Sequence, residues 1–178
     1  VRNGKAIVFL DGTEVARYDA VARDSLVLSP DATRWACTAM KGEKWVVVID
    51  GVEQPGHAGA QVIVFSPNSA RTAYAGIKGD KLVAVVDGQE LAECDGLMQQ
   101  SLKFSPDSQR VACVLLRGPV KGGKRTVMVD GAEGPAYDDI LSGSPCFSPD
   151  SSHVGYIASR GGGQLVVLDG REGPEYDW

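Results

Sequence analysis

The sequence predicts an all-β protein, a β-propeller built of four-stranded antiparallel blades, with about four complete blades and a two-strand partial blade. Two turn signals recur about every 40 residues, which is the period of a four-stranded blade. The segments that lead into the second signal are apolar at successive positions. The turns are the Ser-Pro pairs that begin at Ser29, Ser66, Ser105 and Ser148, and the Asp-Gly pairs that begin at Asp11, Asp50, Asp87, Asp130 and Asp169.

One repeat shows how each strand is expected to form. A short first strand ends at a turn where Pro106 presets the backbone and Asp107 can accept a hydrogen bond from it. The second strand follows and ends in a Gly-rich turn at residues 118–123. Asp-Gly between two extended runs is a strong hairpin signal, so it joins the third strand to a more polar fourth one. The four expected strands are residues 101–104, 110–116, 125–129 and 132–140.

The third strands carry the most information about architecture. Residues 45–49, 82–86 and 165–168 are almost entirely aliphatic and do not alternate between apolar and polar positions. A strand that is apolar on both faces must be covered on both faces, so we expect each sheet to lie between two neighbouring sheets. No segment keeps a 3.6-residue period, and β-branched residues are dense, which argues against helical repeats of similar length.

The Ser-Pro turns resemble those of the bacterial TolB-type and WD-repeat-like β-propeller family, whose blades carry Phe-Ser-Pro-Asp-Gly between their first two strands. Here the third turn residue is Asp31, Asn68, Asp107 or Asp150, and the glycine of the family is absent from all four turns. The resemblance covers essentially the whole chain. It implies the propeller fold and no particular activity, because propellers perform many unrelated functions.

The repeat divides the chain into one propeller domain with uneven ends. The expected parts are a partial blade at residues 1–27, which leads into the next, and blades at 25–60, 61–100, 101–141 and 142–178. The first unit enters at its third strand, residues 6–10, so that strand has an open edge. The terminal blades would also expose apolar faces, which soluble monomers avoid.

Three arrangements would resolve the open ends. The chain is a piece of a longer propeller, excised or designed; or it completes a ring with another copy; or it closes alone as a small ring. Four blades is the lower end of the usual range, so we favour closure between two copies over solitary closure. The expected partner is therefore protein, in the form of a homodimer.

Composition excludes several classes of protein. Of the 178 residues, 43% are hydrophobic and 23% charged, as in a soluble globular chain, and no apolar run approaches the roughly 20 residues of a membrane helix. The formal net charge of −5 argues against a nucleic-acid partner, which needs a basic surface. Residues 1–5 lack the pattern of a secretory signal, although such a segment could have been removed, so cytoplasm and periplasm both stay open.

Neither a catalytic nor a metal site is expected. The cysteines lie far apart without a Cys-x-x-Cys pair, so we expect no zinc, and we expect no cofactor. His57 and Cys94 could be a base and a nucleophile. However, both share one register position with tyrosines, seven residues after each turn aspartate, which indicates a structural role. The residues in that position are Tyr18, His57, Cys94, Tyr137 and Tyr176, and Cys37 and Cys113 share a second one with Tyr74 and Tyr156.

Two further motifs have structural interpretations. Residues 118–125 approach a phosphate-binding loop, but Arg125 stands where Ser or Thr must hold the metal ion, and the segment joins two strands. The five Asp-Gly-x-Glu turns offer too few oxygens in one place for Ca²⁺, so we interpret their glutamates as solvated turn residues. These glutamates are Glu14, Glu53, Glu90, Glu133 and Glu172.

The repeat also predicts two faces of different charge. Turns after first and third strands lie on one face and collect carboxylates, whereas the turns after second strands lie on the other and collect basic residues. Besides solubility, this lysine-bearing face could dock an acidic protein surface. Its residues are Lys41, Lys44, Lys78, Lys81, Arg117, Lys121, Lys124 and Arg160.

The sequence thus favours a non-enzymatic propeller scaffold for protein binding or self-assembly. One alternative is the propeller portion of a larger hydrolase that resembles prolyl oligopeptidase, with its catalytic domain elsewhere. Another is a designed or excised propeller fragment without a biological activity of its own.

Overall fold

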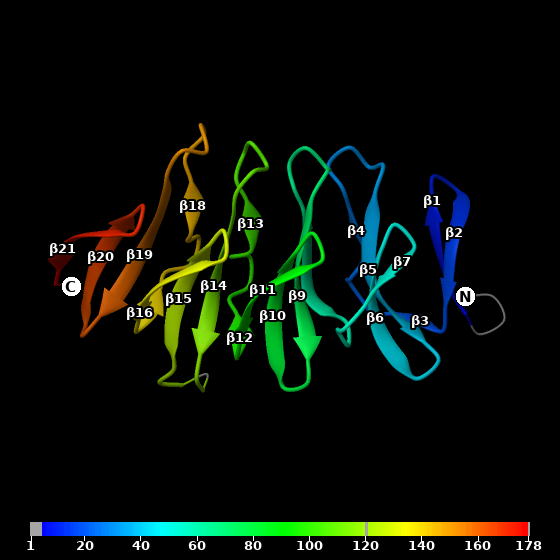
Figure 1. The fold of residues 1–178 in the computed structure, drawn as a ribbon, viewed down its shortest axis with the longest axis horizontal. Coiled ribbons are helices and arrows are strands. Elements are labelled where there is room, and N and C mark those ends of the chain that lie inside the picture. Colours follow the sequence, from blue (N-terminus) through cyan, green and yellow to red (C-terminus); the bar gives the residue numbers. More distant parts are fainter. Residues whose placement is uncertain (1–4, 120, 178) are drawn as a thin grey trace.

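A computed structural model describes residues 5–119 and 121–177, so residues 1–4, 120 and 178 of the expected ranges lie outside it. Five antiparallel sheets stand side by side in a row, and the two ends of the chain lie at opposite ends of the row (Figure 1). The first sheet has two strands, and each of the other four has the four strand positions of a blade, as the sequence predicts, although in three of them the first position is divided between two short strands. The row is open in this structure, not a closed ring.

The sheets follow one another along the chain, and we call them the partial blade and blades 1 to 4. The partial blade holds β1 (Ala6–Leu10) and β2 (Thr13–Tyr18). Blade 1 holds β3 (Ala20–Val21), β4 (Val27–Leu28), β5 (Trp35–Lys41), β6 (Lys44–Ile49) and β7 (Val52–Gln54). Blade 2 holds β8 (Ala60–Phe65), β9 (Thr72–Lys78), β10 (Lys81–Val86) and β11 (Gln89–Cys94).

The last two blades repeat the arrangement of blade 1. Blade 3 holds β12 (Gly96–Leu97), β13 (Lys103–Phe104), β14 (Val111–Arg117), β15 (Lys124–Val129) and β16 (Ala132–Tyr137). Blade 4 holds β17 (Asp139–Ile140), β18 (Cys146–Phe147), β19 (Val154–Arg160), β20 (Gly163–Leu168) and β21 (Arg171–Tyr176).

All five Asp-Gly pairs form the tight hairpins that the sequence predicts. In each pair both residues have positive φ, for example 50° at Asp87 and 79° at Gly88, as a type I′ turn requires. The turn aspartate also accepts a hydrogen bond from the first residue of the second strand, as Asp87 does from the backbone N–H of Thr72 at 2.9 Å. The hairpin is therefore tied to the strand beside it.

The first strand differs from the expectation in three blades. It consists of two short pieces that pair with the same second strand, as β12 and β13 do with β14. Between them Ser101 donates to the backbone carbonyl of Met98 and accepts from the N–H of Val114, which replaces ladder hydrogen bonds. The first pieces at residues 20–21, 96–97 and 139–140 therefore belong to blades that begin before residues 25, 101 and 142.

Adjacent blades pack face to face, and we call each contact a seam. The strands in the middle of the row are covered on both faces, since the third strand of blade 2 has every residue from Leu82 to Val86 at most 5% exposed. Four clusters of buried side chains follow the four seams, and that between blades 1 and 2 includes Val47, Tyr74 and Val85. This confirms the prediction drawn from the aliphatic third strands.

One repeated arginine joins each blade to the next across the seam. Arg71 of blade 2 forms an ion pair with its own turn aspartate Asp87 at 2.8 Å. Its other end donates to the carbonyls of Ser108 and Gln109 in blade 3, at 3.0 and 2.5 Å. The guanidinium also lies 5.2 Å from the centre of the Phe104 ring. Arg34 and Arg110 make the same contacts one blade earlier and one blade later.

A serine in the Ser-Pro turn completes this contact from the other side. The hydroxyl of Ser108 accepts from the backbone N–H of Asn68 in the preceding blade at 3.0 Å. Ser69 and Ser151 do the same at the other two seams. The Ser-Pro turns and the arginines thus connect blades 1 to 4.

We expect Arg71→Ala to lower the free energy of unfolding by about 1–2 kcal/mol, because it removes a partly exposed ion pair and two bonds across a seam. Urea unfolding at pH 7 measures the loss. Arg23→Ala is the matched control, since Arg23 is exposed and has no ion pair among the described residues. An Arg71→Ala protein as stable as the control would contradict the role of the inter-blade arginines.

Candidate binding surfaces

The residues of the lysine-bearing face lie at one end of the four blades. Lys41, Lys78, Arg117 and Arg160 end the second strands. Lys44, Lys81 and Lys124 begin the third strands, and Lys121 lies in the turn between β14 and β15.

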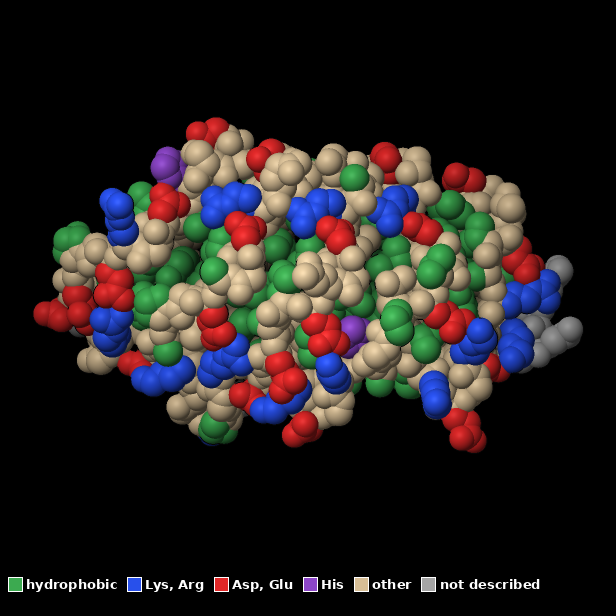
Figure 2. All heavy atoms as spheres, viewed as in Figure 1, with side chains coloured by type: hydrophobic (Ala, Val, Ile, Leu, Met, Phe, Trp, Pro, Cys, Tyr) green, Lys and Arg blue, Asp and Glu red, His purple; other side chains and the backbone are tan. Residues whose placement is uncertain are grey.

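Most of these basic residues have an acidic partner. Lys41 pairs with Glu53 at 2.6 Å, Lys78 with Glu90 at 2.8 Å and Arg117 with Glu133 at 2.5 Å, and Arg160 pairs with Glu172. Lys81 and Lys124 pair with Asp95 and Asp138. Figure 2 shows blue and red side chains close together in two bands on the face in view. The lysine-bearing face therefore presents mostly neutralised charge.

Lys44 and Lys121 have no ion pair among the described residues. The partner that Lys44 would have is missing because Ala58 stands where Asp95 and Asp138 stand in blades 2 and 3. The lysine-bearing face thus has two lysines without an ion pair, and they lie at separate turns. The sequence suggests more unpaired positive charge on this face than the structure has.

The glutamates of the Asp-Gly-x-Glu turns are not simply solvated, which corrects the sequence-based interpretation. Glu172 accepts a hydrogen bond from the Tyr137 hydroxyl of the preceding blade at 2.8 Å. Glu90 lies 3.2 Å from Nε2 of His57, again in the preceding blade. These carboxylates therefore connect blades as well as pairing with a basic residue of their own blade.

His57 and Cys94 are buried at a seam, as their shared register with tyrosines predicts. The His57 ring is 8% exposed and packs edge-on against Tyr74, with ring centres 5.5 Å apart. Cys94 is 2% exposed, and burial raises the pKa of its thiol. Burial also raises the pKa of Cys37 to about 11. Protonated, covered thiols are poor nucleophiles, so a structural role fits these residues.

The segment that approaches a phosphate-binding loop joins β14 to β15 and does not lead into a helix. The backbone N–H of Gly118 donates to the Asp95 side chain of the preceding blade at 2.6 Å. Gly42 and Gly161 make the same bond to Asp19 and Asp138. The glycine turn thus forms a further contact between blades.

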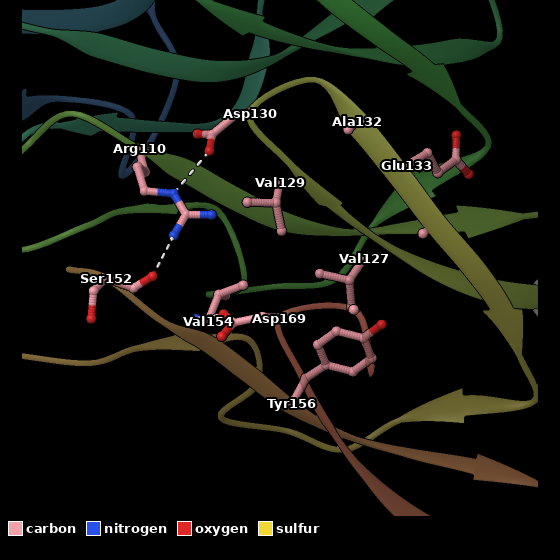
Figure 3. A pocket seen from close by; sticks show the side chains of 12 residues that line it. Arg110, Val127, Val129, Asp130, Ala132, Glu133, Ser152, Val154, Tyr156 and Asp169 are labelled. Atoms are coloured by element: carbon pink, nitrogen blue, oxygen red, sulfur yellow. Dashed lines mark hydrogen bonds and ion pairs between the residues drawn. The ribbon is translucent and has the colours of Figure 1, made fainter. Parts of the chain in front are cut away.

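Sequence reasoning missed a hollow at the seam between blades 3 and 4. It has a volume of about 570 Å³ and lies where the third and fourth strands of blade 3 meet the start of β19. Figure 3 shows Val127, Val129 and Val154 on its walls with the Tyr156 ring beside them. Arg110 and Asp130 form an ion pair at its rim. The sequence gives one sign of this hollow: Gly134 stands at the register position where blade 2 has Leu91.

Among the described residues, no three His, Cys, Asp or Glu side chains gather as metal ligands would. The same residues include no helix long and apolar enough to cross a membrane.

Several solved structures are similar to this chain. The β-propeller domain of the Trilobed protease from Pyrococcus furiosus matches 89% of this chain and 57% of its own length, with a TM-score of 0.52 and 12% identity. TolB from Acinetobacter baumannii matches 93% of this chain and 46% of its own, with a TM-score of 0.44 and 14% identity. A TolB from Agrobacterium tumefaciens, described as putative in its name, matches 89% and 66%, with a TM-score of 0.42 and 14% identity.

The chain spans about half the length of the first two of these structures. No protein-family model matches the sequence, and no curated protein does. The likeness to the propeller domain of the Trilobed protease, together with the arrangement of the sheets, therefore establishes the fold, an all-β propeller of four-stranded blades.

We expect acid to destabilise the seams. Hydrogen bonds from Ser148 and Ser152 lower the pKa of Asp150 to about 2, and ion pairs with Lys81 and Arg117 lower the pKa values of Asp95 and Glu133. Since folding lowers these pKa values, the stability they contribute is complete above the ordinary values of 3.8 and 4.5 and is lost as the pH falls below them.

Urea unfolding at pH 7, 5 and 3 measures this effect. The midpoint should change little between pH 7 and 5 and fall clearly by pH 3. A midpoint that stays constant down to pH 3 would contradict the role assigned to the carboxylates.

Proposed function

We propose that this chain is a non-enzymatic scaffold that assembles with a second copy, blade 4 of each packing on the partial blade of the other. The observation that carries the proposal is the pair of apolar faces at the two ends of the row. Each inner face is covered by the next blade, whereas these two are not. A contiguous apolar patch of this kind is typical of a protein interface.

The outer face of blade 4 repeats the positions that are buried inside the row. Val166 is 52% exposed, whereas Ala84 and Val127 at the same register position are 0% and 2% exposed. Leu168 and Tyr176 are also largely exposed, and residues Ile157, Leu165, Val166 and Tyr176 line a hollow of about 440 Å³. The face thus has the shape and composition of half a seam.

The partial blade offers the complementary half. Phe9 is 56% exposed, and its register position in blades 1 and 2 is occupied by Val48 and Val85, which are fully buried against the preceding unit. Glu14 occupies the register of Glu90 and Glu172, and it pairs with Arg17. In the proposed dimer, the hydroxyl of Tyr176 from one copy would therefore lie near the Glu14 carboxylate of the other, as the Tyr137 hydroxyl lies near Glu172.

The substitution of one inter-blade arginine supports this pairing. His153 takes the register position of Arg34, Arg71 and Arg110, and among the described residues its side chain bonds Asp169 of its own blade, at 2.6 Å. The described part of the partial blade consists of β1 and β2, which correspond to the third and fourth strands of a blade and include no Ser-Pro turn. Blade 4 lacks the inter-blade arginine, and the described partial blade lacks the turn that would accept it, so the two end faces are compatible.

The buried positions of His57 and Cys94 support the non-enzymatic part of the proposal. Among the described residues, these were the two with side chains suited to base or nucleophilic catalysis that the sequence singled out. Both are covered by the adjacent blade.

Light scattering at low micromolar concentration tests the assembly. We expect twice the chain mass of 18.8 kDa for the natural sequence and the single mass for Val166→Glu, because a buried carboxylate at the contact would lack a partner. Val52→Glu is the matched control, since Val52 is 63% exposed on blade 1, away from both end faces, and should leave the dimer intact. A monomer at every concentration, or a dimer that survives Val166→Glu, would overturn the proposal.

A further inference from the structure

The hollow between blades 3 and 4 has a smaller counterpart between blades 2 and 3. Val86, Asp87 and Val111 line the counterpart at the positions where Val129, Asp130 and Val154 line the larger hollow. The volumes are about 360 and 570 Å³. Both hollows lie at the same place in the repeat, so the difference between their volumes must come from residues that differ between the two blades.

That change is the side chain at the fourth residue after the turn aspartate. In blade 2 it is Leu91, and a Cβ added to Gly131 of the next turn would lie 3.8 Å from Leu91 Cδ2. In blade 1 it is Gln54, whose Oε1 would lie 4.0 Å from a Cβ on Gly88. In blade 3 it is Gly134, and nothing lies within 4 Å of a Cβ on Gly170. The larger hollow is thus a place that an aliphatic side chain occupies one seam earlier.

Loss of that side chain uncovers deeper groups. Val127 and Tyr156 line only the larger of the two hollows. A Cβ on Gly134 would lie 3.6 Å from the Tyr156 hydroxyl, so this oxygen faces the vacated space. Three valine side chains form an aliphatic part of the wall, as Figure 3 shows with Val127, Val129 and Val154.

The two hollows also differ in charge. The smaller one is lined by Arg71 and Arg110 together with Asp87 and Asp130, which makes it neutral. The larger one is lined by one arginine and three carboxylates, of which Glu133 is already paired with Arg117, so a formal charge of −1 remains; the charged lining residues are Arg110, Asp130, Glu133 and Asp169. Asp169 has His153 in place of a permanently charged arginine as its partner. A cation at the rim is therefore favoured here and not at the seam before.

We propose that the hollow between blades 3 and 4 binds a segment of another protein in which a leucine or methionine side chain is flanked by Lys or Arg. The aliphatic side chain takes the place that Leu91 fills in the preceding seam, and the basic neighbours face Asp130 and Asp169. Gly134 lies in β16, an edge strand that pairs only with β15 among the described strands and so leaves its outer backbone groups for an extended segment. Binding here does not depend on assembly through the end faces.

The proposal is tested by titrating ¹⁵N-labelled protein with a capped pentapeptide, glycine-lysine-leucine-lysine-glycine. We expect chemical-shift changes at Val127, Val129, Gly134 and Val154. Replacing the leucine of the peptide by serine should weaken binding about tenfold or more, because a leucine side chain would no longer be buried. Shifts that centre elsewhere, or equal affinity for the serine peptide, would overturn the proposal.

Two variants test the site from the protein side. Gly134→Leu supplies the side chain of Leu91 and should abolish binding; its φ is not positive, so leucine suits the backbone, although the Cβ would lie 3.3 Å from the Val127 carbonyl oxygen. Asp169→Asn keeps the side-chain acceptor for the N–H of Val154 and should weaken the lysine peptide about two- to fivefold. Asp87→Asn, in blade 2, is the matched control and should leave binding unchanged.

The remaining outcomes are also decisive. If Gly134→Leu does not fold, the comparison of Asp169→Asn with Asp87→Asn decides. If leucine amide alone binds as tightly as the peptide, the hollow is a small-molecule site and the proposal of a protein segment is wrong. Unchanged affinity in both Gly134→Leu and Asp169→Asn would refute it as well.

Discussion

The burial of the third strands on both faces is the constraint on which the rest of the structure depends. A strand such as β10, with no residue from Leu82 to Val86 more than 5% exposed, cannot form part of a sheet with one wet face. Each sheet therefore needs a neighbour on either side, and apolar side chains collect at four seams and not in one central core. The same constraint makes the end sheets incomplete, because Phe9 and Val166 occupy positions that the row buries everywhere else.

Polar groups at the seams fix how adjacent blades are positioned, which apolar packing alone does not. The inter-blade arginines, the Ser-Pro serines and the glutamates all reach from one blade to an adjacent one, so the turns that close hairpins also set the spacing of blades. Hydrogen bonds of charged groups demand a defined geometry, whereas aliphatic contacts tolerate sliding. Departures from the repeat are then informative: His153 replaces an arginine at the open end, and Gly134 replaces a side chain at one seam.

Much of the fold could be predicted because its signals are local and repeated. Asp-Gly hairpins depend on two residues that tolerate positive φ, and the double-sided burial of β6 and β10 is visible as almost entirely aliphatic runs. The two-piece first strands could not be foreseen, since Ser101 replaces ladder bonds through contacts with Met98 and Val114. The sequence placed the basic residues of the lysine-bearing face correctly at the turns after the second strands. It could not show that Glu53, Glu90 and Glu133 neutralise three of them, because these ion pairs depend on distances between strands.

By itself, the sequence determined the repeat, the strand types, the hairpins and the register position that His57 and Cys94 share with tyrosines. These follow from residue identity and spacing within about 40 positions, where backbone preference and burial act. Only the tertiary structure decided which charges are paired, which faces stay open and where a seam is hollow. Such features depend on whether side chains from different blades meet. The missing side chain at Gly134 shows as a hollow only when the seam is compared with the preceding one, where Leu91 fills the equivalent space.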